Sequence, residues 1–267
     1  MTHIARLDSR ALISVTGEDW ASFLQGLITQ DLESLAPGEL RFGGLLTPQG
    51  RLLYDMFILG ERDGCRLDVA LEHRPAVMQR LMIYRLRAKV KIEADETPVF
   101  AAWPAGADLD GCPDPRLPDL GLRIYAAEAA PNADEAAYHA HRLALGVPGP
   151  DDWGSDKTYP IEANFDLLNG IDFKKGCFVG QETTSRMKRR GTIKSRMAPL
   201  TLSGPAAETE ILAGTLRAGE VTSIIGDRAM ALLRLDRISG DLTLGGVAVE
   251  VDMPEWLRPS AEIGPQT

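Results

Sequence analysis

The most distinctive chemistry of the chain is concentrated between Lys174 and Arg196, which read KKGCFVGQETTSRMKRRGTIKSR. This stretch holds eight basic residues and one acidic residue. It can bind an anion, although charge runs of this kind are often only solvated surface. Gly176, Gly180 and Gly191 favour the binding interpretation, because glycines let the backbone approach a bound group closely.

A cysteine at the start of this stretch could supply a reactive thiol. Cys177 follows Lys174 and Lys175 and precedes residues 180–188, which can form a short helix. Ammonium groups and the amides at a helix N-terminus both stabilise a thiolate, so we predict a functional thiol. The alternative is a buried, inert cysteine, which we expect for Cys65 and consider for Cys112.

Several other kinds of site are excluded by residue spacing. The three cysteines are odd in number and widely spaced, which argues against a disulfide framework and favours a reducing compartment. There is no CxxC, so this chain alone cannot form a zinc ribbon or a four-cysteine iron–sulfur site. His139 and His141 are two residues apart on a predicted helix and cannot share a metal. We therefore predict no metal site, and the nucleotide-loop and serine-hydrolase patterns are absent.

The overall composition is that of a soluble globular protein. The chain has 267 residues and a formal net charge of −9, which argues against a general nucleic-acid or membrane coat. No stretch approaches 18 consecutive apolar residues. The N-terminus lacks the apolar core of a secretory signal, so we expect no leader segment.

The elements that must position these residues alternate without a regular repeat. Residues 16–30 carry apolar side chains at helical spacing, and helices are also predicted from about Pro75 and over 132–145. Strands are predicted over the segments 41–46, 51–59, 65–71 and 87–92. After residue 196 the pattern changes to short glycine-bounded strands at 219–225, 228–235 and 246–252, which indicates a separate small β unit. Together these elements favour an α+β fold.

The cysteine stretch resembles a known family signature. Lys175, Gly176, Cys177, Phe178, Gly180, Gln181 and Glu182 match the K-G-C-[FY]-x-G-Q-E pattern of YgfZ-type folate-binding proteins. Those proteins are related to the glycine-cleavage T-protein and to the mitochondrial iron–sulfur assembly factor of the same family. The similarity extends to the segments 23–32, 46–51, 84–90, 160–164 and, more loosely, 219–223.

The resemblance implies a three-lobed ring around a central channel, with two α+β lobes and a small C-terminal β-barrel. On this basis residues 1–46 and 138–195 form the first lobe. Residues 47–137 form the second, ferredoxin-like lobe, and residues 196–260 form the barrel. Residues 261–267 are expected to be a frayed tail.

The resemblance also implies that tetrahydrofolate binds in the channel. A pterin needs polar contacts and an apolar wall, and its acidic tail needs basic residues. The candidates for the pterin are Gln49, Glu162 and Asn164, and those for the tail are Arg87, Lys174, Arg189 and Arg190. Asn164 could equally be a turn residue, Gln49 a hairpin tip and Arg87 an exposed strand position.

The expected function is that of an accessory protein rather than a turnover enzyme. Residues 67–74 lack the asparagine of the aminomethyl-transferring relatives and the spacing at which an aspartate follows it near folate, so a group for general acid–base catalysis is missing. The resemblance implies support of [4Fe–4S] enzymes through Cys177, with indirect effects on tRNA modification. The alternatives are a folate-dependent aminomethyl or one-carbon transferase and a folate-binding docking module.

The expected partners are a reduced folate and iron–sulfur assembly proteins or their client enzymes, without direct nucleic-acid or membrane binding. We expect a monomer. It would lie in the bacterial cytoplasm, or in the mitochondrial matrix if the source is eukaryotic.

Overall fold

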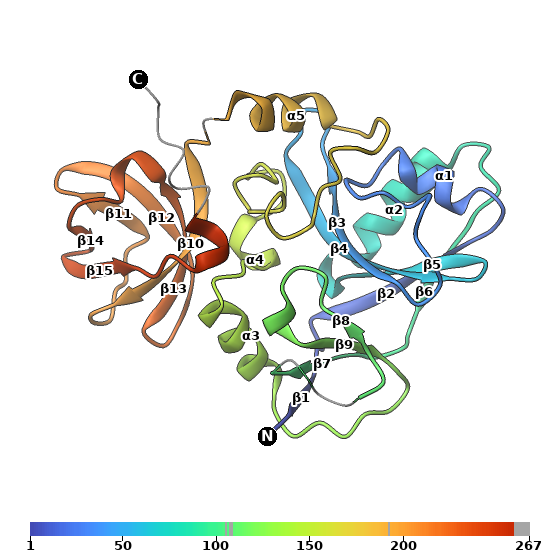
Figure 1. Ribbon diagram of the computed structural model, residues 1–267, viewed down its shortest axis with the longest axis horizontal. Helices are drawn as coiled ribbons and strands as arrows, with labels where there is room; N and C mark the ends of the chain where they lie inside the picture. Colours follow the sequence, from blue (N-terminus) through green and yellow to red (C-terminus); the bar gives the residue numbers. More distant parts are fainter. Residues whose placement is uncertain (105, 107–108, 192, 259–267) are drawn as a thin grey trace.

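The computed structural model describes residues 1–258, except 105, 107–108 and 192, so the predicted tail at 261–267 lies outside the described residues. Strands form three separate sheets, one of them a closed barrel. Figure 1 shows the barrel on the left and the two open sheets on the right, with α4 and the chain that follows it between them.

The largest open sheet has the strand order β3-β4-β5-β2-β6. Its strands are β2 (Arg10–Thr16), β3 (Leu40–Leu46), β4 (Leu52–Glu61), β5 (Gly64–Ala70) and β6 (Lys91–Asp95). All pairs are antiparallel. Helices α1 (Trp20–Gln25) and α2 (Arg74–Arg85) contribute Leu24, Val77 and Leu81 to the core on one of its faces.

The opposite face of this sheet packs on the middle of the chain. Phe42, Leu46 and Phe57 form one cluster with Phe165 and Phe178. This cluster also includes residues of α3 (Glu135–Ala144), α4 (Pro150–Trp153) and the barrel, so it lies where the large sheet, the middle of the chain and the barrel meet. The cysteine stretch is therefore fixed to the sheet by burial of Phe178.

A smaller sheet has the order β1-β7-β9-β8, formed by β1 (His3–Arg6), β7 (Val99–Trp103), β8 (Cys112–Pro113) and β9 (Leu122–Tyr125). Helix α3 packs on it through Tyr138, which contacts the ring of Trp103 at 5.6 Å between centroids. The N-cap of α3 is Asp134, whose carboxylate accepts a hydrogen bond from the Ala137 amide.

The predicted β unit is a closed six-stranded barrel. Its strands are β10 (Ser195–Leu202), β11 (Glu210–Ala213), β12 (Leu216–Ile225), β13 (Arg228–Arg234), β14 (Leu242–Leu244) and β15 (Val247–Val251). The apolar residues that alternate along these strands fill its interior. The predicted change of character near residue 196 is confirmed.

Two predicted elements were wrong in their bounds. The helix expected over residues 16–30 ends at Gln25, because the chain turns at Gly26 and residues 28–32 fold back into the core. The strand expected over 87–92 begins at Lys91, since the chain turns after α2 and Ala88 donates to the Arg85 carbonyl.

The five-stranded sheet takes strands from both sides of the predicted domain boundary at residues 46 and 47, since β3 pairs with β4. The predicted boundary between the first and second lobes therefore falls inside this sheet, between two paired strands. Short 3-10 turns at 71–73, 118–120, 235–237 and 255–257 complete the described structure.

Candidate functional site

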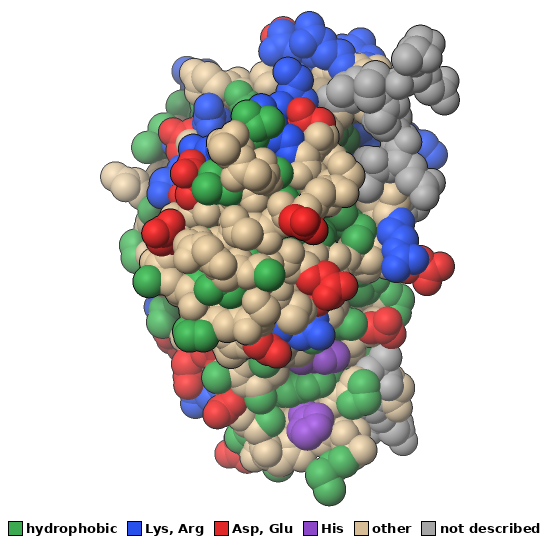
Figure 2. All heavy atoms as spheres, turned by 90° about the vertical axis from the view of Figure 1, so that its left-hand side faces the viewer, with side chains coloured by type: hydrophobic (Ala, Val, Ile, Leu, Met, Phe, Trp, Pro, Cys, Tyr) green, Lys and Arg blue, Asp and Glu red, His purple; other side chains and the backbone are tan. Residues whose placement is uncertain are grey.

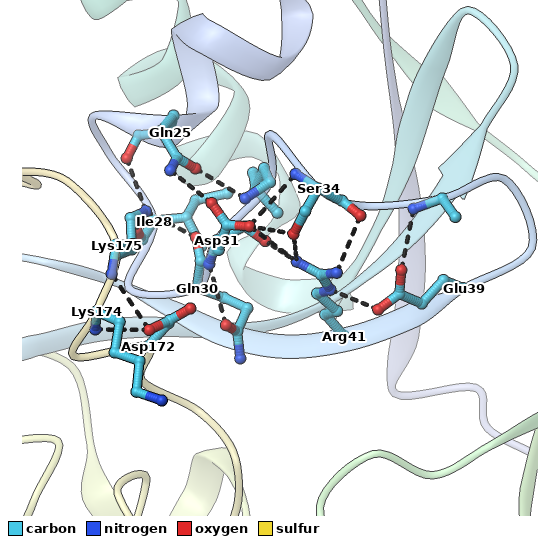
Figure 3. Close-up of polar contacts among 12 residues, drawn as sticks. Gln25, Ile28, Gln30, Asp31, Ser34, Glu39, Arg41, Asp172, Lys174 and Lys175 are labelled. Carbon is cyan, nitrogen blue, oxygen red and sulfur yellow. Dashed lines mark hydrogen bonds and ion pairs between the residues drawn. The ribbon is translucent and has the colours of Figure 1, made fainter.

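The cysteine loop, residues 172–180, is anchored to the end of α1 by Lys175. Its ammonium Nζ donates to the carbonyl oxygens of Gln25, Ile28 and Gln30 at 2.8, 2.6 and 2.7 Å. Figure 3 shows this ammonium facing the chain that leaves α1. Three carbonyls at one cation leave no donor of Lys175 free for another partner.

Burial of this ammonium has an electrostatic consequence. Desolvation lowers the pKa of Lys175 to about 8, although the carboxylates of Asp31 and Asp172 favour the charged form. Asp172 also caps the loop, since its Oδ1 accepts from the amides of Lys174 and Lys175 at 2.7 and 3.2 Å. The motif lysine therefore acts as a clamp on the loop.

The segment that receives Lys175 is itself held rigidly. Gln25 donates from Nε2 to Asp31 at 2.7 Å and accepts from the Leu32 amide at 2.7 Å (Figure 3). Hydrogen bonds from Ser34 and Gln25 lower the pKa of Asp31 to about 2. Arg41 binds the Asp31 carbonyl at 2.7 Å. The clamp of Lys175 thus joins the loop to a fixed part of the molecule.

The other end of the loop packs against the tip of the β3–β4 hairpin. Gly180 has a φ of 81°, and a Cβ at this position would lie 2.6 Å from the Thr47 carbonyl oxygen. A Cβ on Gly50 would in turn meet Thr183 at 2.8 Å. Glycine is required at both positions because the two backbones touch. The predicted hairpin and the signature therefore meet directly.

Cys177 is exposed between these two anchors. It precedes α5 (Gln181–Arg190), whose N-cap is Gly180 and whose last turn carries Lys188, Arg189 and Arg190. Figure 2 shows Lys and Arg side chains gathered at the top of the molecule, where α5 lies in Figure 1. A thiol that is exposed in a loop held at both ends is accessible to a visiting molecule.

A groove of about 590 Å³ runs beside α5 and is lined by Phe173, Gln181, Glu182, Ser185, Lys188 and Arg189. Phe173 is partly exposed, and the Lys188 ammonium lies 5.4 Å from its ring centroid. Three residues that the sequence singled out, Gln181, Glu182 and Arg189, therefore share one surface.

A second candidate site is a central cavity of about 260 Å³ between the two open sheets, α3 and α4. Its lining includes Arg10, Asp55, Phe57, Arg116, Arg123 and Arg142. The guanidinium of Arg123 lies 3.7 Å from the Phe57 ring centroid. An apolar ring wall with convergent charged groups is typical of a small-molecule site.

The charges around this cavity form a buried network. Asp68 accepts from Arg10 Nε at 2.6 Å and from the Tyr125 hydroxyl at 3.1 Å, and it also pairs with Arg123. Asp114 pairs with Arg116 at 2.7 Å. Burial alone would raise the pKa of Asp114, but Arg116 and Arg123 hold it below its ordinary value.

Some polar atoms of the cavity lack partners within the described residues. Asp55 Oδ1 is buried without a hydrogen bond, while its Oδ2 accepts from Arg10 at 3.0 Å. The Nε atoms of Arg123 and Arg142 are also unsatisfied. Unpaired buried polar atoms are costly, so a ligand with donors and acceptors would be stabilised here.

The rim of the cavity carries a hydrogen-bonded trio. Ser9 donates its hydroxyl to Glu135, and His139 Nε2 lies 3.6 Å from the Glu135 carboxylate. Burial would raise the pKa of Glu135, but the hydrogen bonds from His139 and Ser9 keep it below its ordinary value. The carboxylate therefore stays ionised at the cavity entrance.

The seven predicted folate residues do not line the central cavity. Asn164 is fully buried at a φ of 62°; its Nδ2 donates to the Met197 carbonyl at 2.8 Å and its Oδ1 accepts from Arg196 at 3.1 Å. Glu162 accepts from the Tyr159 amide at 3.0 Å, and burial raises its pKa. Both residues join the middle segment to β10.

The remaining predicted contacts lie at the surface. Gln49 is exposed at the hairpin tip and Arg87 is exposed on the turn after α2. Lys174 and Arg190 are exposed on the cysteine loop and on the end of α5. Their folate contacts stay predictions, and the structure groups only Arg189 with the α5 groove.

Sequence reasoning missed the central cavity. Its residues come from segments far apart in the sequence, and each arginine or aspartate alone resembles a surface charge. One signal in the sequence could have indicated it. Asp55 is a carboxylate within the apolar strand that also holds Phe57, and a charged residue in such a strand is unusual.

The other cysteines differ from Cys177. Cys65 is buried as expected, and desolvation raises the pKa of its thiol. Cys112 is half-buried, and burial raises its pKa too. Within the described residues no cluster of three or more His, Cys, Asp or Glu side chains could hold a metal ion. In the same residues, no helix has the length and apolar character needed to span a membrane.

Comparison with solved structures defines the fold. The glycine cleavage system aminomethyltransferase T from Bartonella henselae superposes with a TM-score of 0.74 at 17% sequence identity, covering 94% of this chain and 84% of that chain. Residues 194–259 match the family described as CAF17, C-terminal beta-barrel domain. The chain thus has a T-protein-like fold with a closed C-terminal barrel, and the predicted fold class is confirmed.

Comparison with curated proteins defines the family. The mitochondrial iron-sulfur cluster assembly factor IBA57 of Homo sapiens is 30% identical, covering 94% of this chain and 84% of the relative. The IBA57 homolog of Coccidioides immitis is 32% identical, with 96% and 77% covered. The chain belongs to the family of IBA57 iron–sulfur cluster assembly factors. It spans 55% of the length of the Neurospora crassa homolog.

Proposed function

We propose that this protein supports the assembly or repair of [4Fe–4S] enzymes, and that Cys177 is the group through which it acts. The observation that carries the proposal is the exposed Cys177 thiol in a loop fixed at both ends, by Lys175 and by Gly180. Membership of an iron–sulfur cluster assembly family supports the same function.

The iron–sulfur cluster, or its iron or sulfur, is the cargo in this proposal. A single cysteine supplies one ligand, so the remaining ligands of any cluster come from a partner protein. The residues of this chain hold the thiol in place and keep it exposed to a partner. Iron–sulfur assembly proteins or client enzymes are the proposed partners, and effects on tRNA modification would follow indirectly.

We place the proposed tetrahydrofolate in the central cavity. The unpaired Asp55 Oδ1 could accept from the amino group of a pterin, and Phe57 offers a ring wall. The volume of about 260 Å³ lies just below the range of small-molecule sites, roughly 300–1,000 Å³, so the cavity would take the ring system of the ligand and not its tail. Reduced folate, when bound, could carry a one-carbon unit. The acidic tail would then extend towards basic residues outside the cavity.

Substitution of Asp55 tests the folate site. Asp55→Asn should weaken tetrahydrofolate binding roughly 10-fold to 100-fold, because a charged hydrogen bond is worth about 1.5–3 kcal/mol. Titration calorimetry measures this affinity. The same titration with Arg189→Glu/Arg190→Glu tests the predicted contacts with the tail. If Asp55→Asn bound tetrahydrofolate with unchanged affinity, the proposal that the pterin lies in this cavity would be contradicted.

The function of the thiol is tested in cells that lack the protein. Cys177→Ser should leave the activity of [4Fe–4S] enzymes as low as an empty vector does, while tetrahydrofolate binding stays intact. Cys112→Ser, at a half-buried cysteine outside the loop, serves as the control and should restore activity. Full activity with Cys177→Ser would exclude a function of the thiol. The alternative of a folate-binding docking module without thiol chemistry would then remain.

A folate-dependent aminomethyl transferase is the second candidate, favoured by the T-protein-like fold. Against this candidate, the carboxylate of Asp68 already accepts hydrogen bonds from Arg10, Arg123 and Tyr125, so its oxygens are engaged within the chain and not directed at a substrate. Glycine-dependent transfer of a methylene group to tetrahydrofolate would establish the enzyme.

The compartment follows from the relatives. The curated IBA57 proteins are mitochondrial by name. We therefore propose the mitochondrial matrix for a eukaryotic source and the cytoplasm for a bacterial one, with the protein acting as a monomer.

A further inference from the structure

The end of α2 exposes an unusual group of apolar side chains. Met82, Ile83, Tyr84 and Leu86 are 47%, 66%, 36% and 86% exposed. Single exposed apolar residues are ordinary, but adjacent ones form a patch that marks an interaction site. We call these four residues the α2 knob.

The backbone of the α2 knob is strained at Leu86. The turn is closed by the Ala88 amide, which donates to the Arg85 carbonyl at 2.7 Å. Leu86 has φ 43° and ψ −104°, the geometry of the first central residue of a type II′ turn, where glycine is preferred. Its side chain is exposed, so burial does not compensate for the strain. A strained residue whose side chain is exposed is therefore a candidate for a functional role.

The charges around the α2 knob are unpaired. Arg80, Arg85 and Arg87 make no ion pair or side-chain hydrogen bond in the part of the chain that the structure describes. Lys89, in contrast, pairs with Glu18 at 2.7 Å. Three unpaired arginines in a chain with net charge −9 complement acidic side chains on another molecule.

Helix α1 connects the α2 knob to the cysteine loop. The Lys89 amide donates to Asp19, before α1, at 2.8 Å, and the Val179 amide donates to Gly26, after α1, at 3.1 Å. Figure 1 shows the end of α2 beside α1. Six helical residues span about 9 Å, so one protein-sized partner can reach both ends of α1.

We propose that the α2 knob and its three arginines are the docking surface for a protein partner with an apolar pocket edged by Asp and Glu, and that this partner is the molecule that meets Cys177. The second half of this proposal rests on the proposed function. A membrane is the other occupant that such a surface could take, and the vesicle experiment below distinguishes it from a protein. A second copy is disfavoured because a two-fold contact would bring the same arginines together.

The strained turn allows a sharp test, because Leu86→Gly removes the side chain and relieves the strain. Leu86→Gly and Leu86→Ala should both fold, and Leu86→Gly should unfold at the same temperature as the native protein or a higher one. In cells lacking the native protein, both should lower [4Fe–4S] enzyme activity roughly tenfold, as the loss of a central interface residue would. Leu216→Ala, at a barrel leucine that is 58% exposed, should restore full activity.

A photo-reactive side chain at position 83 identifies the occupant. We expect a crosslink to an acid-rich surface of a protein, with a yield that falls roughly tenfold in Leu86→Gly and not in Leu216→Ala. If Leu86→Gly were fully active while Cys177→Ser was inactive, the proposed docking surface would be wrong. The proposed function of the thiol would not be affected by that result. Leu86-dependent binding to vesicles of phosphatidylcholine and cardiolipin, or a dimer lost in Leu86→Gly, would overturn it as well.

Discussion

Lys175 shows how one residue of the signature serves the cysteine without contacting the reacting group. Its Nζ satisfies three backbone carbonyls that would otherwise be unpaired at the end of α1. The sequence suggested that its charge acts on Cys177. The structure shows instead that all three of its donors bind the backbone, so its main effect is to hold the loop.

The pH dependence of stability should report the burial of this ammonium. The pKa of Lys175 is lowered to about 8, so between about pH 8 and the ordinary lysine value near 10.4 the unfolded chain binds more protons than the folded one. The contribution of Lys175 to the free energy of unfolding therefore rises with pH in this window. Chemical unfolding at several pH values should show this rise, and Lys175→Met should abolish it.

Lys175→Met also leaves three carbonyls without their donor. We expect a loss of about 1–3 kcal/mol, the cost of unsatisfied buried polar groups. Amide hydrogen exchange should increase in residues 172–180. A variant with native stability and unchanged exchange would show that the ammonium does not hold the loop.

At the scale of elements, the contact between the cysteine loop and the β3–β4 hairpin depends on glycine. Gly180→Ala should destabilise the protein by about 1–3 kcal/mol, because φ is 81° and the Cβ would strike the Thr47 carbonyl. Gly176 provides a matched control within the same motif, since a Cβ there meets nothing within 4 Å. Gly176→Ala should leave the unfolding midpoint nearly unchanged. Equal midpoints for the two variants would contradict this role of the hairpin contact.

Sequence patterns predicted the elements whose signals are local. The hairpin at residues 47–50, helix α5 and the start of the barrel were recognised from turn residues and periodicity. The helix over residues 16–30 was overestimated, because its apolar spacing continues past Gly26 although the backbone there is no longer helical. The apolar residues after Gly26 are buried as the spacing suggested, but by a loop.

At the scale of the whole molecule, the site divides into a predictable part and an unpredictable part. The signature around Cys177 is continuous in sequence, and so it could be found. The central cavity joins Arg10 from β2, Asp55 from β4, Arg123 from β9 and Arg142 from α3. No local pattern brings these together, because their proximity depends on how the two open sheets and α3 pack.

The two candidate sites also differ in how the chain supports them. The cavity lies in a buried network of ion pairs, where removal of one partner leaves an uncompensated charge. The cysteine loop lies at the surface and is held by a clamp and a glycine contact. Chemistry at Cys177 can therefore be altered without disturbing the fold.

Selective alkylation of Cys177 uses this difference to test the central claim. The exposed Cys177 should react first with iodoacetamide in the native protein, while the half-buried Cys112, whose pKa is raised by burial, should react more slowly and the buried Cys65 should not react. The reagent is therefore limited to the amount that modifies Cys177. Alkylated and untreated protein would be added to extracts of cells that lack it, and [4Fe–4S] enzyme activity would be measured. We predict that untreated protein restores activity and that alkylated protein does not, whereas equal restoration by both would contradict a role for the thiol.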